Sequence, residues 1–438
     1  MRNLVLVFFI LCANLVEAYD FEKEGIYYNK TYKGLEVTQG YPQCYEGKIV
    51  IPEKVVYEDT EFEVCSIGYS AFSSCGITSL DIPMSVKEIS SFAISGCDNL
   101  TSIVIPDGVL DIGNQAFNGC SNLQSVTIGR NVNRIGFGAF ISCAKLSEIV
   151  IPDNVTSIEA MAFSSCQSLK KIVFGSGIQK IPYQGFMGCV SLESVVIPDN
   201  VQEIGEMAFF GCNALYDLDL RNGVITIGNG AFFDCNINDI YIPQSVKSIS
   251  GSAFSGKNPR ERIIVDVDNT IYDSRDNCNA IIETKSKTLI IGGANTQIPQ
   301  DIVSIGNAAF SSCEILYTIV IPEKVNSIGD YAFYYCKGLK KIVCLPETPP
   351  SCANSTFENV DKSSCMLQVS ENNINAYKAA EYWKDFRLVE STGLHDVNNR
   401  ILEEKIYYDI QGHILSQPRK GLNIVKIRNG ETKKVILK

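Results

Sequence analysis

The chain has 438 residues, of which 45% are hydrophobic and 20% charged, which is the composition of a folded globular protein and excludes wholesale disorder. Its formal net charge of −11 disfavours general binding to DNA, RNA or anionic lipid, because phosphate groups would be repelled. Two histidines stand beside seventeen cysteines, and the sequence has no Gly-x-Ser-x-Gly elbow, Walker loop or His-Glu-x-x-His motif. We therefore expect no enzyme activity, no catalytic residues and no cofactor.

Residues 1–18 have the features of a secretory signal peptide. One positive charge precedes an apolar run from Leu4 to Ala13, and Val16 and Ala18 stand at positions −3 and −1 of the expected cleavage site. The apolar run is too short for a typical membrane span, and no later run reaches 18 residues. We expect an exported protein that has no transmembrane segment.

The pattern Ile-Pro-x-x-Val-x-x-Ile-x-x-x-Ala-Phe-x-x-Cys-x-x-Leu-x-x-Ile recurs with a period of 23 residues. The β-branched residues favour a short strand before each Ile-Pro, Val-x-x-Ile a second one, and Ala-Phe-x-x-Cys a tight helical or 3₁₀ turn. One such unit cannot bury its own apolar face, so the units must stack, with identical residues about 4.8 Å apart. The aromatic marker falls at Phe72, Phe117, Phe140, Phe163, Phe186, Phe209, Phe232, Phe254, Phe310 and Phe333, with Ile94 in one unit and a weaker match at Phe357.

This unit resembles the BspA-like class of bacterial leucine-rich repeats over residues 50–390. The predicted fold is a β-rich solenoid, a right-handed arc of about eleven units of 22–23 residues with short parallel strands and 3₁₀ or short helical turns. Residues 19–28 resemble the N-terminal strands that cap such arrays, and residues 377–386 resemble the unit that closes them. The resemblance implies a cell-surface or secreted bacterial protein, and some members of the family are adhesins for host proteins.

A gap between Phe254 and Phe310 interrupts the repeats. Acidic residues in it suggest calcium, but the EF-hand spacing fails, because Ile271 stands where the loop requires glycine. We favour an irregular repeat and expect no metal site, although a metal site is the open alternative. The predicted organisation is a signal peptide (1–18), an N-terminal β cap (19–65), repeats (66–255), an irregular insertion (256–309), repeats with a closing unit (310–391) and a C-terminal β tail (392–438).

The tail differs from the repeats in period and in charge. Residues 396–438 contain nine Lys or Arg against five Asp or Glu, and two hairpins are predicted around Gly412 and Asn429-Gly430. This segment resembles the β-sandwich sorting domain of type IX secretion. A plain terminal β cap is the alternative.

Ten cysteines occupy one position of the repeat. Residues repeated in register have parallel Cβ vectors about 4.8 Å apart, whereas a disulfide needs converging Cβ atoms about 3.8 Å apart. We expect reduced, buried thiols that donate to carbonyls of the turns, with partial pairing or metal binding as alternatives. These ladder cysteines are Cys75, Cys97, Cys120, Cys143, Cys166, Cys189, Cys212, Cys235, Cys313 and Cys336. Better disulfide candidates lie off the ladder, at Cys44, Cys65, Cys344, Cys352 and Cys365.

The sequence of the first strand in each unit predicts a surface that could bind a partner. In Ile103-Val104-Ile105 the two isoleucines should point into the core and the middle residue outward. Repeated along the array, the outward position forms a mostly apolar column with a polar rim, which is typical of a partner-binding site. The alternative is that valine simply stacks on valine and favours strands. The candidate binding residues are Val104, Val150, Val173, Val196, Asp219, Tyr241, Val320 and Val343.

These features together predict a monomeric protein, secreted or held at the bacterial cell surface, that mediates adhesion or protein–protein interaction. The expected partner is a protein, with host extracellular-matrix proteins as one class, and neither nucleic acid nor a membrane is expected. A surface glycan-binding module is the alternative. It would need aromatic platforms to stack sugars, and the tyrosines near the first strands, Tyr216, Tyr241 and Tyr317, are sparse.

Overall fold

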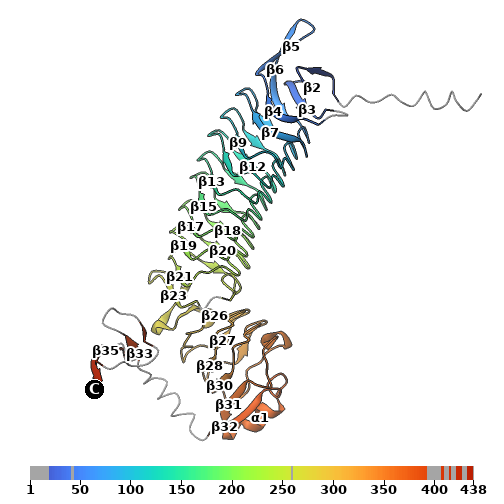
Figure 1. Cartoon of the computed structure of the whole chain (residues 1–438). Coiled ribbons are helices and arrows are strands. Elements are labelled where there is room, and N and C mark those ends of the chain that lie inside the picture. The colour runs from blue at the N-terminus through green and yellow to red at the C-terminus, as the bar shows by residue number, and fades with distance from the viewer. Residues whose placement is uncertain are drawn as a thin grey trace, which may run out of the picture.

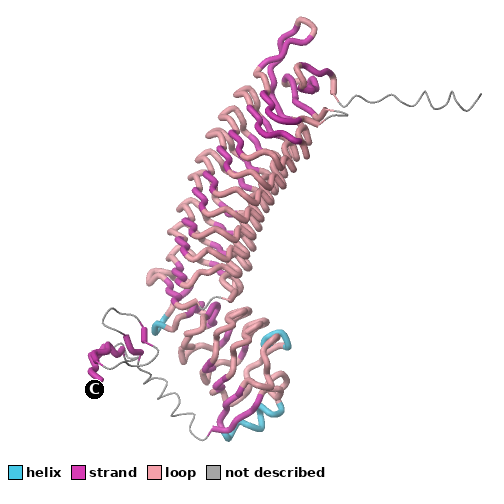
Figure 2. The backbone as a smooth tube through the Cα atoms, in the orientation of Figure 1, coloured by secondary structure: helices cyan, strands magenta, loops and turns pink. Residues whose placement is uncertain are grey.

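The protein is described by a computed structural model that covers residues 19–391, apart from 41–43 and 258–259, together with the backbone of four short strands after residue 405. The predicted signal peptide at 1–18 lies outside the described residues. Short strands stack into an elongated array that is offset between β23 (Arg262–Val265) and β26 (Thr288–Gly292), as Figure 1 shows. Figure 2 shows that the array consists almost entirely of strands, turns and loops.

The N-terminal cap is an antiparallel meander that continues directly into the repeats. β2 pairs with β1 and with β3, and β3 then pairs in parallel with β6. Tyr28 on β2 is fully buried and stacks on Phe21, so the cap covers the apolar end of the array. The strands of this region are β1 (Phe21–Lys23), β2 (Ile26–Thr31), β3 (Gly34–Thr38), β5 (Lys54–Tyr57) and β6 (Thr60–Ile67).

The first strands of the units form one long face of the array, with the predicted parallel pairing. Fourteen such strands are described, more than the eleven units predicted, because the cap adds one strand and the closing unit adds two. They are β4 (Glu46–Val50), β7 (Gly76–Asp81), β9 (Ser102–Val104), β11 (Ser125–Thr127), β13 (Glu148–Val150), β15 (Lys171–Val173), β17 (Ser194–Val196), β19 (Asp217–Asp219), β21 (Asp239–Ile242), β23, β28 (Thr318–Ile321), β30 (Lys341–Cys344), β31 (Met366–Ser370) and β32 (Arg387–Ser391).

The second strands are shorter and form a separate parallel ladder. Each begins with a polar or charged residue that pairs with its own counterpart one unit away, and each ends with a buried isoleucine. They are β8 (Glu88–Ile89), β10 (Asp111–Ile112), β12 (Arg134–Ile135), β14 (Ser157–Ile158), β16 (Lys180–Ile181), β18 (Glu203–Ile204), β20 (Thr226–Ile227), β22 (Ser248–Ile249), β27 (Ser304–Ile305) and β29 (Ser327–Ile328).

The gap in the repeats is a folded, irregular part of the array. β23 still pairs in parallel with β21, so the first-strand face extends into it. An antiparallel meander of β24, β25 and β26 follows, and β26 then pairs in parallel with β27 to restart the second ladder. The hydrophobic core divides into two clusters in this region. The new elements are β24 (Tyr272–Asp273), the 3₁₀ helix η1 (Arg275–Asn277) and β25 (Ala280–Glu283).

The closing unit carries most of the helix in the described residues. Tyr377, Trp383 and Phe386 are buried and pack with Phe357 at the end of the second core. Its helices are η2 (Asn354–Phe357), η3 (Glu371–Asn373) and α1 (Ile374–Ala379). Beyond it, an antiparallel sheet in the order β34-β33-β35-β36 occupies the predicted β tail, with β33 (Ile406–Tyr408), β34 (Ile414–Leu415), β35 (Gly421–Lys426) and β36 (Thr432–Leu437). Within the described part of the chain, no helix is long and apolar enough to cross a membrane.

The phenylalanine markers form the centre of the core. From Phe117 to Phe254 the ring of each unit stacks on the next, with centroids between 4.9 and 5.4 Å apart and nearly parallel planes. The centroid distances exceed the strand spacing of about 4.8 Å, so the rings are offset, which is the arrangement that aromatic quadrupoles prefer. The weak match at Phe357 is confirmed, because its ring stacks on Phe333 at 5.3 Å.

The short turns that carry the markers include the predicted 3₁₀ type, since Phe357 ends the 3₁₀ helix η2, but the turns from Phe72 to Phe232 contain left-handed residues. Around Phe117 the backbone is left-handed at Gln115, where φ is 54°, and at Gly119, where φ is 70°. This alternation of hand prevents a helix. It leaves the Phe117 N–H free to donate to the carbonyl of Ala139 in the next unit, while the Cys120 N–H donates to the Phe117 carbonyl within the turn.

The predicted ladder of reduced thiols is confirmed for nine of its ten positions. Each of these cysteines is free and buried. With the exception of Cys313, each thiol donates to the carbonyl of the marker residue in the preceding unit, at 3.0 to 3.3 Å. The carbonyl of Phe117, for example, accepts both the Cys120 N–H and the Cys143 thiol, so both of its lone pairs are used.

Cys75 is the exception, and the prediction that it is reduced is wrong. It forms a disulfide with Cys44. Cys75 belongs to the first unit that has the marker, so no earlier marker carbonyl is available for its thiol, and the sulfur is free to bond to the cap. Among the off-ladder candidates only Cys44 is bonded, since Cys65, Cys344, Cys352 and Cys365 are free thiols in this structure.

Replacing Phe163 by Ala should lower the free energy of unfolding by about 3 to 5 kcal/mol. Its ring packs on Phe140 at 5.2 Å and on Phe186 at 5.3 Å, so both contacts would be lost. The matched control is Phe254→Ala, because that ring stacks on Phe232 alone and should cost less. Urea unfolding followed by far-ultraviolet circular dichroism measures both. Equal losses would contradict the view that stacking is shared along the column.

Alkylation of the native protein at about pH 8 should label Cys65 first, because this free thiol is partly exposed. Cys352 is also partly exposed, but burial raises its pKa to about 11, so it should react more slowly. Burial raises the pKa of Cys166 to about 12, so this thiol stays protonated and covered. After denaturation without reductant, thiol pKa values return to about 8.5, and all nine free ladder thiols should react. Peptide mapping should recover Cys44 and Cys75 as one linked pair. Ladder cysteines linked to each other would show that the thiol column is wrong.

Candidate functional site

The candidate site is the outward column of the first-strand face. Its residues are brought together by the register of the parallel strands, which pairs Val150 with Val173 and Thr127 with Val104. The phase predicted for these strands is confirmed, because Ile103 and Ile105 are buried on either side of an exposed Val104. Large apolar side chains therefore stand in open solvent. They are Val104, 63% exposed, Val150, 56%, Val173, 41%, Val196, 50%, and Tyr241, 52%.

Two further candidates lie in the column but are less accessible. Asp219 pairs with Val196 across the strands and is half-exposed, and its carboxylate forms an ion pair with Arg221 at 2.7 Å. Val320 is also half-exposed. Both positions belong to the surface, but they contribute less apolar area than the five residues above.

Val343 was predicted to be exposed, and this is wrong, because only 2% of its surface is accessible. The register places it between Val320 on β28 and Gln368 on β31, inside the sheet that leads into the closing unit. Both neighbouring side chains are themselves only half-exposed. Since a partner could not reach Val343, it is removed from the candidate site.

The column extends further toward the N-terminus than predicted. Val50 at the end of β4 is 54% exposed and pairs in register with Asp81 of β7. The sequence contained the signal, because Val50 is followed by the same Ile-Pro that follows Val104, Val150, Val196 and Val320. Ile264 on β23, the register partner of Tyr241, also occupies the column. It has no following proline, so the repeat pattern did not identify it.

Tyr241 is fixed in place by its polar end. Its hydroxyl donates to the carboxylate of Asp266, in the loop after β23, and this bond lowers the pKa of Asp266. The second oxygen of the same carboxylate accepts the backbone N–H of Asp268. The tyrosine ring is therefore presented on the surface by a hydrogen bond that links neighbouring units.

The second-strand face has a different character. Arg134 lies between the carboxylates of Asp111 and Glu159, at 2.7 and 2.8 Å. Lys180 pairs with Glu203 at 2.6 Å. These charges neutralise one another within the face, and exposed ion pairs of this kind contribute little to stability. The two faces of the array thus differ, and only the first offers exposed apolar side chains in register.

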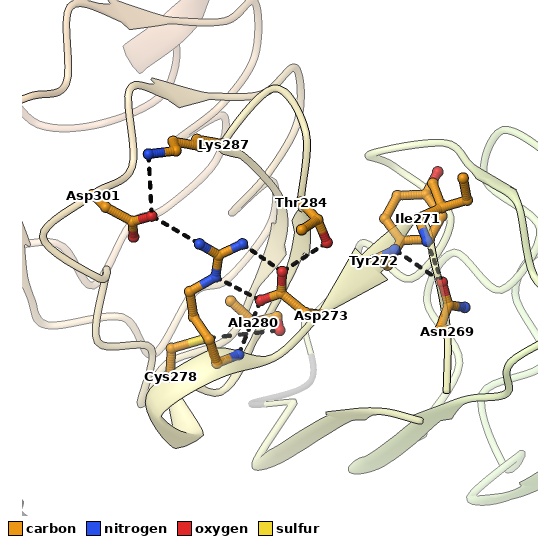
Figure 3. Close-up of polar contacts among 10 residues, drawn as sticks. Asn269, Ile271, Tyr272, Asp273, Cys278, Ala280, Thr284, Lys287 and Asp301 are labelled. Carbon is orange, nitrogen blue, oxygen red and sulfur yellow. Dashed lines mark hydrogen bonds and ion pairs between the residues drawn. The ribbon is translucent and has the colours of Figure 1, made fainter. Parts of the chain in front are cut away.

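Asp273 and Asp301, two of the acidic residues of the gap, are paired within the chain. Arg275 and Thr284 both donate to the carboxylate of Asp273, and Arg275 also binds Asp301 at 2.7 Å (Figure 3). Burial alone would raise the pKa of Asp273, but these hydrogen bonds outweigh burial and hold that pKa below its usual value. Among the described residues, no group of three or more His, Cys, Asp or Glu is placed to hold a metal ion.

Two solved structures of bacterial proteins are similar to this chain. A leucine-rich repeat protein from Bacteroides ovatus is 26% identical, covers 85% of this chain and 100% of its own, and has a TM-score of 0.63. A leucine rich cell surface protein from Faecalibacterium prausnitzii is 22% identical, covers 86% of this chain and 96% of its own, and has a TM-score of 0.49. No curated protein matches the chain.

The BspA type leucine rich repeat region matches the chain in segments that span most of the array. It matches residues 52–154, 135–261 and 293–390, which together cover more than two thirds of the sequence. The unmatched stretch at 262–292 coincides with β24, η1 and β25, where the structure departs from the repeat. The match, the stacked units and the thiol ladder agree, and the chain belongs to the family of BspA-type leucine-rich repeat proteins.

Proposed function

We propose that this protein is exported and acts without catalysis, as a surface interaction or adhesion protein that binds another protein along its first-strand face. The observation that carries the proposal is the in-register column of exposed β-branched residues from Val104 to Val196. Contiguous apolar surface of this kind tends to mark an interaction site. Repeat arrays use such extended faces for binding, because the scaffold behind them is rigid.

The chemistry of the face favours a protein partner. A valine side chain has little rotamer freedom to lose, so its contacts are formed at low entropic cost. Beside the apolar column, Glu148 lies next to Lys171 and Asp239 next to Arg262 on neighbouring strands. An apolar centre with a rim of both charges is the usual anatomy of a protein interface. The expected partner therefore has an apolar strip bordered by charges of both signs.

Glycan binding has weaker support. Sugars are held by stacking on aromatic faces, and Tyr216 and Tyr317 are well exposed. However, they precede β19 and β28, which lie on opposite sides of the gap, so they do not form one platform. A panel of extracellular-matrix proteins tested beside a glycan array separates the two functions. Binding to glycans alone would contradict the proposal.

Val150→Lys and Val196→Lys should each weaken binding to the protein partner by about 30-fold, because desolvated central contacts typically contribute about 2 kcal/mol. Both side chains are at least half-exposed, so the new ammonium stays in water and the free energy of unfolding should change by about 0.5 kcal/mol. Surface plasmon resonance on the partner found in the panel measures the loss.

Ser248→Lys is the matched control, because it places the same charge on an exposed position of the second-strand face. This variant should bind as the native protein does. Equal weakening by all three lysines would indicate a general charge effect. No weakening by any of them would place the binding surface elsewhere.

We also propose that residues 392–438 direct the protein to the cell surface. The support is the four-stranded antiparallel sheet formed by β33 to β36, which is separate in sequence from the repeats, and the basic charge of this segment. A chain ending at residue 391 should keep the thermal unfolding of the array but appear in the medium instead of the surface fraction. Cell fractionation with an antibody to the repeats measures this. If the chain that ends at residue 391 stays attached to the cell surface, the proposal is wrong and the tail is a plain cap.

A further inference from the structure

The junction between the two parts of the array contains a buried arginine with unused hydrogen-bond donors. Only 1% of the surface of Arg260 is accessible. Its Nη1 donates to the carbonyl of Phe254 at 3.0 Å, whereas Nε and Nη2 have no hydrogen-bond partner among the residues that the structure describes. A guanidinium does not lose its proton in proteins. A full positive charge is therefore buried at this point, and within the described residues its only hydrogen-bond partner is a neutral carbonyl.

The repeat explains why Arg260 is drawn into the core. In regular units the marker carbonyl accepts the thiol of the next unit, as the Phe117 carbonyl accepts Cys143. The next ladder cysteine after Phe254 is Cys313, which lies beyond the gap in the repeats. Arg260 donates to the Phe254 carbonyl in place of that thiol. The guanidinium thus occupies a gap in the thiol column, and its charge opposes the effect of burial on the pKa of Cys336 further along that column.

A second buried donor without a described partner lies five residues before Arg260 in the sequence. Directly after Phe254, the hydroxyl of Ser255 is buried and has no hydrogen-bond partner in the described part of the chain. Guanidinium N–H groups only donate, and a hydroxyl can donate. Ser255 and Arg260 therefore both carry hydrogen-bond donors that no acceptor among the described residues satisfies.

We propose that the junction binds a small monovalent anion, chloride in most surroundings, on Arg260 Nε and Nη2, with the Ser255 hydroxyl as a further donor. An unpaired buried charge is strongly unfavourable, and an anion compensates for it by accepting the spare hydrogen bonds. The guanidinium is enclosed, which favours a compact ion over a carboxylate-bearing ligand. This site is independent of partner binding on the first-strand face. The proposed anion site lies at the place where the array is offset (Figure 1).

Thermal unfolding at constant ionic strength tests the proposal, with sodium chloride or bromide compared with sodium gluconate, whose anion is too large to enter. In halide the midpoint should rise by about 1 to 2 °C for each tenfold increase in concentration above the dissociation constant. Arg260→Met keeps the chain length without the charge and should abolish this rise. Arg262→Met removes an exposed arginine two residues away and should retain it. An equal halide effect in the native protein and in R260M would overturn the proposal.

A second measurement does not depend on the stability of a variant. In crystals of the native protein soaked in bromide, an anomalous peak should lie within hydrogen-bond distance of Arg260 Nε or Nη2. Density that shows these groups bound to carbonyls or water alone would overturn the proposal. In gluconate, R260M should be at least as stable as the native protein, because there the native charge has no counterion. A clear loss of stability in R260M under that condition would also count against the site.

Discussion

The stacking of each residue on its own copy, one unit away, decides what every position of this protein can hold. A flat ring is stable at the marker position because flat rings lie above and below it, as Phe163 lies between Phe140 and Phe186. A charge is tolerated on a ladder where the neighbouring units provide opposite charges, as they do for Arg134. A uniform column of one charge would be disfavoured by its own repetition. The same rule places exposed valines of neighbouring units side by side, as it does for Val150 and Val173.

This rule also explains why so much of the fold could be predicted. Periodicity alone indicates which residues share a column, and alternation along a strand indicates which of them point inward. The burial of Ile103 and the exposure of Val104 follow from those two facts without any knowledge of the rest of the chain. The candidate site could be predicted to the same extent, because a column on the surface is as periodic as a column in the core.

The errors lie where the repetition ends. The thiol of each unit donates backward to the preceding marker carbonyl, so Cys75, which has no preceding marker, joined the cap through Cys44. The predicted exposure of Val343 is wrong because its unit lies at the other end of the array, next to the closing unit, where the side chain is covered. Arg260 stands where the thiol column is interrupted. The left-handed residues of the turns were missed because serine, glutamine, methionine and glycine all occupy those positions, so no single residue type indicates them.

The phenylalanine column keeps its spacing although the units differ in length. Steps of 23 residues from Phe117 to Phe140, 22 from Phe232 to Phe254 and 24 from Phe333 to Phe357 all leave the ring centroids between 4.9 and 5.3 Å apart. The extra or missing residue is absorbed in a loop, while the rungs keep their separation. The distance between equivalent residues of neighbouring units is therefore constant along the array. Changes in loop length can alter the residues that lie beside a binding contact. The separation of two binding contacts along the face can change only by a whole number of units.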